Sequence, residues 1–295
     1  MRCVLFKALA ERTLLCDGAM GTMLQQAGLS HGDCPEEWNV THPDVVEGIH
    51  SAYFAAGSDI VLTNTFGANP IKLALYHLAD RTEEFNRAAV RLARKAAGSD
   101  RYVLGDMGSC GGLLEPYGDQ KPEEAEEAFL RQASALAQED LDGIIIETMT
   151  DLEEMKLALK AARQATSLPV IVSMSFQNGS VPHRTLMGQK TTDCALALKD
   201  AGASVIGSNC GVGSAELLEI VREMHSVLGD VPLIAEPNAG LPIIEGDKTV
   251  FPETPEEMAS RTGDFVRAGV RLLGGCCGTS PKHIRALRQA LDQIS

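Results

Sequence analysis

The chain alternates short hydrophobic runs with longer amphipathic segments. Segments with helical spacing, such as residues 152–165 and 214–228, separate runs that are rich in β-branched and aliphatic residues. Eight such runs occur, at residues 13–21, 59–67, 101–109, 143–151, 169–177, 204–212, 232–240 and 270–278. Runs that are apolar throughout are typical of strands buried on both faces of a parallel sheet. The pattern therefore predicts strands and helices in strict alternation.

This alternation predicts an α/β fold, a single (β/α)8 TIM barrel over residues 1–295. Eight strand–helix units in 295 residues match the usual size of such a barrel, and the chain is long enough to bury a large core. A doubly wound open sheet is the alternative, but the first run lacks the G-x-G-x-x-G turn that binds dinucleotides. No low-complexity linker or long repeat indicates a second domain.

Two connections are expected to be long and irregular. Residues 18–51 contain the only tryptophan, Trp38, and are predicted to form a loop or lid over one mouth of the barrel. Residues 237–257 follow the seventh hydrophobic run, and a hairpin turn is predicted there at Glu245-Gly246-Asp247.

Charge and composition narrow the possible partners. The formal net charge is -14, and the acidic residues are spread through helical segments, which argues against a nucleic-acid partner. No hydrophobic run is long enough to span a bilayer, and charges interrupt the N-terminal segment before a secretory signal could form. We therefore expect a cytoplasmic protein with no membrane partner.

The eight cysteines lack the dense spacing of a secreted disulfide framework. In a reducing compartment, cysteines with a function tend to bind metal or to react. Cys16 and Cys194 lie in apolar patterns, and Cys3, Cys34 and Cys110 have no partner that the sequence identifies. We expect these five to be structural.

Polar residues gather where the predicted strands end. Active sites of (β/α)8 barrels lie at the C-terminal ends of their strands. The residues that this chain places there are Asp17, Asn64, Asp106, Glu147, Cys210, Glu236, Asn238, Cys276 and Cys277. For any one of the Asp or Asn residues, turn formation or helix capping is the alternative role. Their convergence on one rim is the stronger indication of a site.

Three of these residues are cysteines that the barrel would bring together. Cys210 ends the sixth run, and Cys276 and Cys277 end the eighth. Three thiolates fill three corners of a tetrahedral zinc site and leave the fourth open, as in catalytic zinc centres. The glycines at positions 274, 275 and 278 allow a tight bend, so that adjacent side chains reach one ion. Buried inert thiols and a strained vicinal disulfide are the alternatives.

The chemistry that suits such a centre is S-alkylation of a thiol. A zinc ion that carries three thiolates is a poor Lewis acid for water, but it binds an incoming thiol and holds it deprotonated near neutral pH. A free alkyl thiol has a pKa of about 8.5 and is mostly protonated at pH 7. Asp17 and Glu147 would receive the ammonium group of an amino-acid substrate, and backbone N–H groups from Gly18 to Gly21 its carboxylate.

Six motifs, in order along nearly the whole chain, carry a family resemblance. They are DGAMGT (17–22), TNTFGAN (63–69), ET (147–148), NCG (209–211), EPNAG (236–240) and GGCCGT (274–279). Together they resemble the homocysteine-binding (β/α)8 domain of the homocysteine S-methyltransferase family. DGAMGT, PEEWNVTHPDVV and EPNAGLP are most similar to the N-terminal module of cobalamin-dependent methionine synthases, rather than to the betaine-dependent branch.

The resemblance implies a site and its ligands. Zn²⁺ would be bound by the three cysteines, and the sulfur of homocysteine would take the open position. Asp17 and Glu147 would hold the substrate amino group, with the backbone of Gly18 and Ala19 near its carboxylate. The resemblance also suggests Asn238 as a neighbour of the metal, or as a temporary fourth ligand when substrate is absent.

The methyl donor follows from the same resemblance. It would be methylcobalamin or another methylcorrinoid on a separate corrinoid-binding domain or protein, and the product would be methionine. The Asp-x-His-x-x-Gly sequence of corrinoid modules is absent from this chain. Two alternatives are a thiol methyltransferase that uses betaine, S-methylmethionine or another small onium donor, and a non-catalytic zinc-binding module.

Overall fold

A computed structural model describes residues 4–246 and 248–294 of the protein. The strands are β1 (Leu14–Leu15), β2 (Ile60–Leu62), β3 (Tyr102–Met107), β4 (Gly143–Met149), β5 (Val170–Met174), β6 (Val205–Gly213), β7 (Leu233–Asn238), β8 (Ile243–Glu245), β9 (Lys248–Val250) and β10 (Val270–Leu273). The α-helices are α1 (Val4–Glu11), α2 (Met20–Gln26), α3 (Trp38–Thr41), α4 (Pro43–Ala56), α5 (Pro70–Ala74), α6 (Thr82–Ala97), α7 (Pro122–Ala137), α8 (Leu152–Ala165), α9 (Thr191–Asp200), α10 (Ser214–Leu228), α11 (Pro255–Ala259), α12 (Thr262–Arg267) and α13 (Pro281–Asp292). Two 3-10 helices are η1 (Pro35–Glu37) and η2 (Ala79–Arg81).

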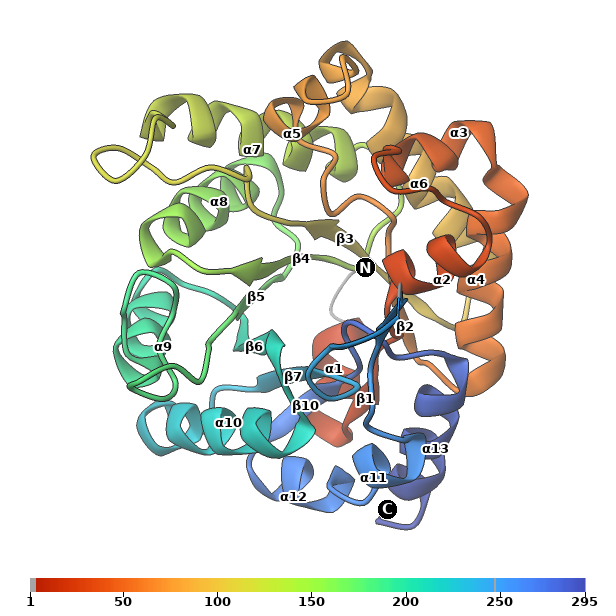
Figure 1. The fold of residues 1–295 in the computed structure, drawn as a ribbon, viewed down its shortest axis with the longest axis vertical. Helices are drawn as coiled ribbons and strands as arrows, with labels where there is room; N and C mark the ends of the chain where they lie inside the picture. The colour runs from red at the N-terminus through yellow and green to blue at the C-terminus, as the bar shows by residue number, and fades with distance from the viewer. Residues whose placement is uncertain (1–3, 247, 295) are drawn as a thin grey trace.

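Eight parallel strands form a nearly closed barrel inside a ring of helices (Figure 1). Their order is β1-β10-β7-β6-β5-β4-β3-β2. The two ends of this sheet meet, because the backbone N–H of Asp59, just before β2, donates to the carbonyl of Leu15 in β1 at 2.7 Å. The predicted TIM barrel is confirmed. That residues 1–295 form one domain stays a prediction.

The interior of the barrel is a packed hydrophobic cluster to which each barrel strand contributes. Its strand members are Leu14, Ile60, Leu104, Ile145, Ile171, Val205, Ile234 and Leu272. Helix α1 adds Leu5 and Leu9, each 2% exposed, and so covers the N-terminal end of the barrel. The opposite end, where the strands finish, stays open for a site.

The connection over residues 18–51 differs from the expected irregular loop, because most of it is helical. Pro35 and Pro43 stand at the first positions of η1 and α4, where the missing N–H of proline costs no hydrogen bond. Helix α4 ends at Gly57 with a φ of 111°, a conformation that suits glycine. Trp38 stacks on His42 with ring centroids 4.2 Å apart.

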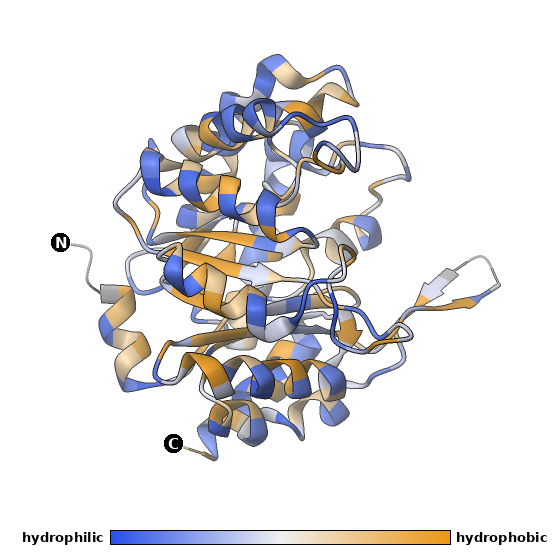
Figure 2. Ribbon diagram, turned by 90° about the vertical axis from the view of Figure 1, so that its left-hand side faces the viewer, coloured by the Kyte–Doolittle hydropathy of each residue, from blue (hydrophilic) through white to orange (hydrophobic). Residues whose placement is uncertain are grey.

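The predicted hairpin is present after β7. Strands β8 and β9 pair antiparallel, with Ile243 opposite Val250 and Glu245 opposite Lys248. Asp247 of the predicted turn lies outside the described residues. The hairpin projects from the molecule on the side opposite α1 (Figure 2). None of the helices in the described part of the chain is long and apolar enough to cross a membrane.

Candidate active site

A cavity of about 350 Å³ opens at the C-terminal ends of the strands. It brings together almost all residues that the sequence analysis proposed for a site: Asp17, Gly18, Ala19, Glu147, Cys210, Cys276 and Cys277 line it. Asn64, Asp106 and Glu236, which the sequence placed at strand ends without a role, line it as well. Asn238, at the end of β7, is not among the residues that line the cavity, but its side chain is close enough to Cys210 to help lower the pKa of that thiol. The convergence expected from the strand order is therefore real.

The geometry of the three cysteines fits a zinc ion. Their Sγ atoms lie within 4.8 Å of one another. The Cys210 and Cys277 sulfurs are 3.9 Å apart, and those of Cys276 and Cys277 are 4.0 Å apart. Tetrahedral zinc with Zn–S bonds of about 2.3 Å places its sulfur ligands about 3.8 Å apart. The same distances exclude a vicinal disulfide in this structure, because a disulfide bond is about 2.05 Å long.

Backbone irregularities aim the site residues into the cavity. The pairing of β6 with β7 shifts register between Asn209 and Gly213, and Cys210 within this bulge has a φ of 58°. The pairing of β4 with β5 shifts between Ile146 and Met149, and Thr148 there also has a φ of 58°. Bulges re-aim side chains beside active sites, and left-handed non-glycine residues store strain that function commonly explains.

The three cysteine thiols differ in their pKa values because each affects the others. Hydrogen bonds from Cys276 and Cys277 lower the pKa of the Cys210 thiol to about 3. The interaction with Cys210 raises the pKa of Cys277 to about 12 and that of Cys276 well above its usual value. Hydrogen bonding among the sulfurs thus stabilises a thiolate within this group. A divalent cation among the sulfurs would allow all three to ionise.

Asn209 is a functional candidate that the sequence analysis quoted within NCG but gave no role. Its side-chain N–H₂ donates to Glu147 Oε2 at 2.8 Å and to Thr148 Oγ1 at 2.7 Å. Its Oδ1 accepts from the Thr148 backbone at 2.9 Å and from the Ser173 hydroxyl at 2.8 Å. Asn209 therefore holds the end of β4 in place and orients the Glu147 carboxylate beside the cysteines.

Thr279 links the segment at residues 17–22 to the segment at residues 274–279, both of which contain glycines of the site. Its hydroxyl accepts from the Ala19 backbone N–H at 3.1 Å and donates to the carbonyl of Cys276 at 2.7 Å. A Cβ at Gly18 or at Gly275 would stand 2.7 Å from the Thr279 Oγ1 atom. Glycine at both positions is thus required for this close approach. The final Thr of the GGCCGT motif was the available sequence signal.

Burial sets the protonation of the two carboxylates proposed to bind substrate. Desolvation, with a smaller effect of Cys210, raises the pKa of Glu147 to about 8. Asp17 is 3% exposed, and desolvation raises its pKa well above the usual value, although the Leu62 backbone N–H donates to its Oδ2 at 3.1 Å. A cationic group of a ligand would restore the charged forms of both.

The remaining described cysteines lie apart from this centre. Cys16, Cys34, Cys110 and Cys194 are buried and unbridged. Cys3 lies outside the described residues. The expectation that Cys16, Cys34, Cys110 and Cys194 are structural agrees with this burial.

A family model for homocysteine S-methyltransferase matches residues 14–291. This chain belongs to the homocysteine S-methyltransferase family. The methionine synthase of Mycobacterium leprae (strain TN) is 35% identical over 309 residues, which cover 99% of this chain and 25% of that protein. The methionine synthase of Mycobacterium tuberculosis (strain ATCC 25618 / H37Rv) is 36% identical over 308 residues, which cover 98% of this chain and 25% of that protein. The chain thus spans about a quarter of the length of the curated relatives it matches.

Solved structures agree with the family fold. The metallated form of the homocysteine methyltransferase MmuM from Escherichia coli superimposes with a TM-score of 0.79 at 23% identity, over 98% of both chains. A methyltransferase from Methanosarcina mazei gives a TM-score of 0.65 at 12% identity, over 99% of this chain and 98% of the other. At these identities the likeness supports the barrel fold. The match to the family model supports assignment of homocysteine as the methyl acceptor.

Proposed function

We propose that this homocysteine S-methyltransferase uses zinc and takes its methyl group from a methylcorrinoid, such as methylcobalamin, held on another domain or protein. The observation that carries the zinc assignment is the group formed by Cys210, Cys276 and Cys277, whose sulfur atoms lie within 4.8 Å of one another. With three protein ligands, a tetrahedral zinc ion keeps one position for the substrate. When bound there, zinc would hold the sulfur of homocysteine as a reactive thiolate.

The other residues of the cavity would bind and orient the amino-acid part of homocysteine. Asp17 and Glu147 would accept hydrogen bonds from the ammonium group, and Asn209 would keep Glu147 in position. The backbone at Gly18 and Ala19 borders the cavity where α2 begins, and no described side chain caps this helix. The Ala19 N–H already donates to Thr279, so the N–H groups in the first turn of α2 are the ones left for the substrate carboxylate. Asn238 is proposed as a neighbour of the metal, or as its fourth ligand before substrate binds.

The aromatic content of the cavity favours a corrinoid over a small onium donor. Proteins commonly bind quaternary ammonium groups against the faces of several aromatic rings. Among the described residues that line the cavity, Phe66 is the one aromatic side chain. The Nζ atom of Lys72 already lies 4.4 Å from the centre of its ring. An onium group at the Phe66 ring would be repelled by the positive charge of Lys72, which already occupies one face of the ring.

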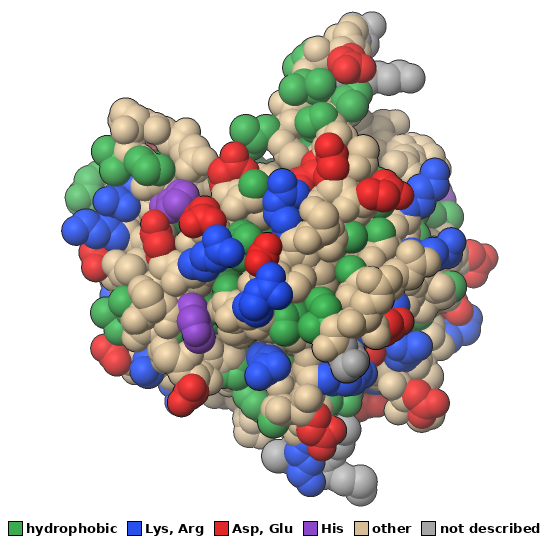
Figure 3. Space-filling view, turned by 90° about the horizontal axis from the view of Figure 1, so that it is seen from below, with side chains coloured by type: hydrophobic (Ala, Val, Ile, Leu, Met, Phe, Trp, Pro, Cys, Tyr) green, Lys and Arg blue, Asp and Glu red, His purple; other side chains and the backbone are tan. Residues whose placement is uncertain are grey.

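Hydrophobic side chains around the mouth support a protein-sized donor. Most of the large hydrophobic residues that are exposed in the described chain lie in the connections that follow β2, β3, β5 and β7: Leu75, Tyr76, Leu113, Tyr117, Val181, Leu186, Leu241, Ile243 and Ile244. The hairpin that carries Ile243 and Ile244 borders one side of a notch in the surface (Figure 3). Exposed apolar groups that gather on one face are typical of protein interaction sites.

The test is methionine formation by zinc-loaded protein with homocysteine and one donor at a time. Methylcobalamin is expected to support turnover, and betaine and S-methylmethionine are not. Turnover with a small onium donor and none with methylcobalamin would overturn the donor assignment but leave the thiol chemistry intact. X-ray absorption at zinc tests the non-catalytic alternative, because a purely structural site would show no change when homocysteine is added.

A further inference from the structure

The cavity is lined by carboxyl groups without a cationic side chain to balance them. Its acidic residues are Asp17, Glu36, Asp106, Glu147 and Glu236, and the described residues that line it include no Lys, Arg or His. Buried carboxylates are costly unless they are paired with a cation or fully hydrogen-bonded. Lys72 lies behind Phe66 and interacts with Glu36 and Asp106, but it does not line the cavity. A cationic group of a ligand inside the cavity would therefore be stabilised by these carboxyl groups and would favour their charged forms.

These carboxyl groups differ in how well the protein itself satisfies them. Glu36 accepts from the Gly67 backbone at 2.7 Å and from the Cys34 thiol at 3.3 Å. Asp17 accepts a backbone N–H, and Glu147 accepts from the side chain of Asn209.

Two carboxyl oxygens of the cavity walls stand apart from these. Asp106 Oδ1 and Glu236 Oε2 are buried and have no hydrogen-bond partner among the described residues. The two unsatisfied oxygens are thus on residues to which neither the sequence nor the family resemblance assigned a role.

Hydrogen bonds fix the backbone of Asp106, whereas one oxygen of its carboxyl group has no partner among the described residues. The residue is 5% exposed, at the end of β3. Its backbone N–H donates to Thr63 Oγ1 at 2.9 Å, and its carbonyl accepts from the Thr65 hydroxyl at 2.6 Å. Desolvation, followed by the charge of Glu147, raises the pKa of Asp106 well above its usual value. A cation that entered the cavity would be drawn to this fixed group.

We propose that Asp106 accepts the third hydrogen bond of the homocysteine ammonium group, beside Asp17 and Glu147, and thereby selects α-amino thiols. An ammonium group donates three hydrogen bonds, and two acceptors leave one of them unpaired in a buried site. Asp106 lines the same cavity as Asp17 and Glu147 and keeps an oxygen free for this contact. This inference rests on the proposed function, because it takes homocysteine as the ligand.

Glu236 provides a matched comparison within the same cavity. It is 3% exposed and also has an unpartnered oxygen, and the Cys16 thiol close to it partly offsets the desolvation that raises its pKa. Its Cγ atom would lie 3.2 Å from a Cβ built at Gly274, which places it against the segment that leads to the cysteine pair. The variant Glu236→Gln therefore removes a buried carboxyl of the same wall without touching Asp106.

The experiment compares two ligands that differ only in the amino group. Calorimetry measures the binding of L-homocysteine and of 4-mercaptobutanoate to zinc-loaded wild type, Asp106→Asn and Glu236→Gln. Asp106→Asn is expected to weaken homocysteine binding by about 10-fold or more, since hydrogen bonds to charged groups are strong. Binding of 4-mercaptobutanoate, which has no amino group, should change less than about 2-fold in the same variant.

The outcomes separate this inference from the proposed function. Equal weakening of both ligands, or of neither, in Asp106→Asn would overturn the role of Asp106, and so would a selective loss that appears only in Glu236→Gln. Wild-type protein that binds neither thiol would overturn the proposed function itself. Zinc content and 4-mercaptobutanoate binding report whether the variant is folded, and Asp106→Ser replaces it if it is not, with the same selective loss expected.

Discussion

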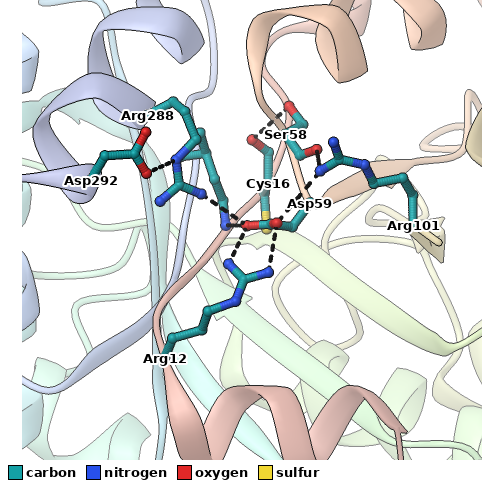
Figure 4. A network of polar contacts seen from close by, with 8 residues as sticks. Arg12, Cys16, Ser58, Asp59, Arg101, Arg288 and Asp292 are labelled. Atoms are coloured by element: carbon teal, nitrogen blue, oxygen red, sulfur yellow. Dashed lines mark hydrogen bonds and ion pairs between the residues drawn. The ribbon is translucent and has the colours of Figure 1, made fainter. Parts of the chain in front are cut away.

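Asp59 and Asp106 are buried aspartates at opposite ends of neighbouring barrel strands, and their surroundings are opposite too. Asp59 precedes β2 at the N-terminal end. Its carboxylate accepts two hydrogen bonds from Arg12, at 2.9 and 2.8 Å, and one from the Leu15 backbone at 2.9 Å (Figure 4). Arg288 of α13 approaches it to 3.3 Å. Asp106, at the C-terminal end of β3, leaves one oxygen with no partner in the described structure.

The same burial has opposite electrostatic results at the two ends. Desolvation alone would raise the pKa of Asp59, but the hydrogen bonds from Arg12 and Leu15 outweigh it and lower the pKa. Around Asp106, neighbouring carboxylates add to desolvation, and the pKa rises. The N-terminal end thus ties α1, β2 and α13 together and stabilises the fold. The C-terminal end keeps polar groups unsatisfied, at a cost in stability, so that a ligand can satisfy them.

Of the changes that test this difference between the two ends of the barrel, we expect the largest effect from a substitution of a cysteine at the C-terminal end. Cys276→Ala removes one of three sulfur ligands, and we expect zinc content and methyl transfer to homocysteine to fall together, with turnover reduced by at least about 1,000-fold. Metal analysis and a turnover assay measure both. Cys194→Ala, which changes a buried cysteine of α9, is the control and should retain zinc and activity. Full zinc content in Cys276→Ala would refute the assignment.

A smaller effect, on stability, is expected at the N-terminal end. Asp59→Asn leaves Arg12 without its anionic partner, whereas Arg288 keeps its ion pair with Asp292. The free energy of unfolding at pH 7 should fall by about 2–4 kcal/mol, less than for a fully buried pair because Arg12 is half exposed. Urea unfolding measures this, with the exposed Asp119→Asn as control.

The pH dependence of stability tests whether the ion pairs of Asp59 cause the expected loss. Because its folded pKa is lowered, its contribution is present above the unfolded pKa of about 3.9 and is lost as pH falls through the folded value. The stability difference between wild type and Asp59→Asn should therefore shrink on acidification. A constant difference from pH 7 down to strongly acidic pH would show that the ion pairs are not its cause.

The smallest effect is expected at Glu154 of α8, an intermediate case between Asp59 and Asp106. It is 4% exposed and accepts one backbone N–H, from Cys110, at 2.7 Å. Desolvation raises its pKa to about 7, so its contribution to stability is present below the unfolded pKa of about 4.3 and is lost as pH rises through about 7. Glu154→Gln should thus be more stable than wild type by about 1–2 kcal/mol at pH 8.5.

Urea unfolding at two pH values checks this last prediction. At pH 5 most of the advantage of Glu154→Gln should be gone, since the wild-type carboxyl is then largely neutral in the fold. The exposed neighbour Glu153, which pairs with Lys156 on the surface, gives the control variant Glu153→Gln, with an expected change below about 0.5 kcal/mol at either pH. An equal gain at both pH values would indicate better packing rather than relief of a buried charge.

The sequence by itself determined the barrel and the rim at which the candidate site residues meet. Hydrophobic runs that alternate with amphipathic segments depend on local periodicity, and parallel strands necessarily end at one rim, so Cys210 and the Cys276–Cys277 pair could be placed together from strand order alone. The hairpin after β7 was also readable, because turn residues act locally.

Only the tertiary structure decided how each of these groups is oriented and satisfied. Helix α1 covers one end of the barrel, and the bulges at Cys210 and Thr148 turn side chains into the cavity. Asn209 binds groups on β4 and β5, far away in the sequence. Whether an aspartate meets an arginine, as Asp59 does, or faces a cavity, as Asp106 does, depends on what lies opposite it in space. No local pattern in the sequence encodes that distance, and the burial that sets each pKa exists only after the barrel has closed.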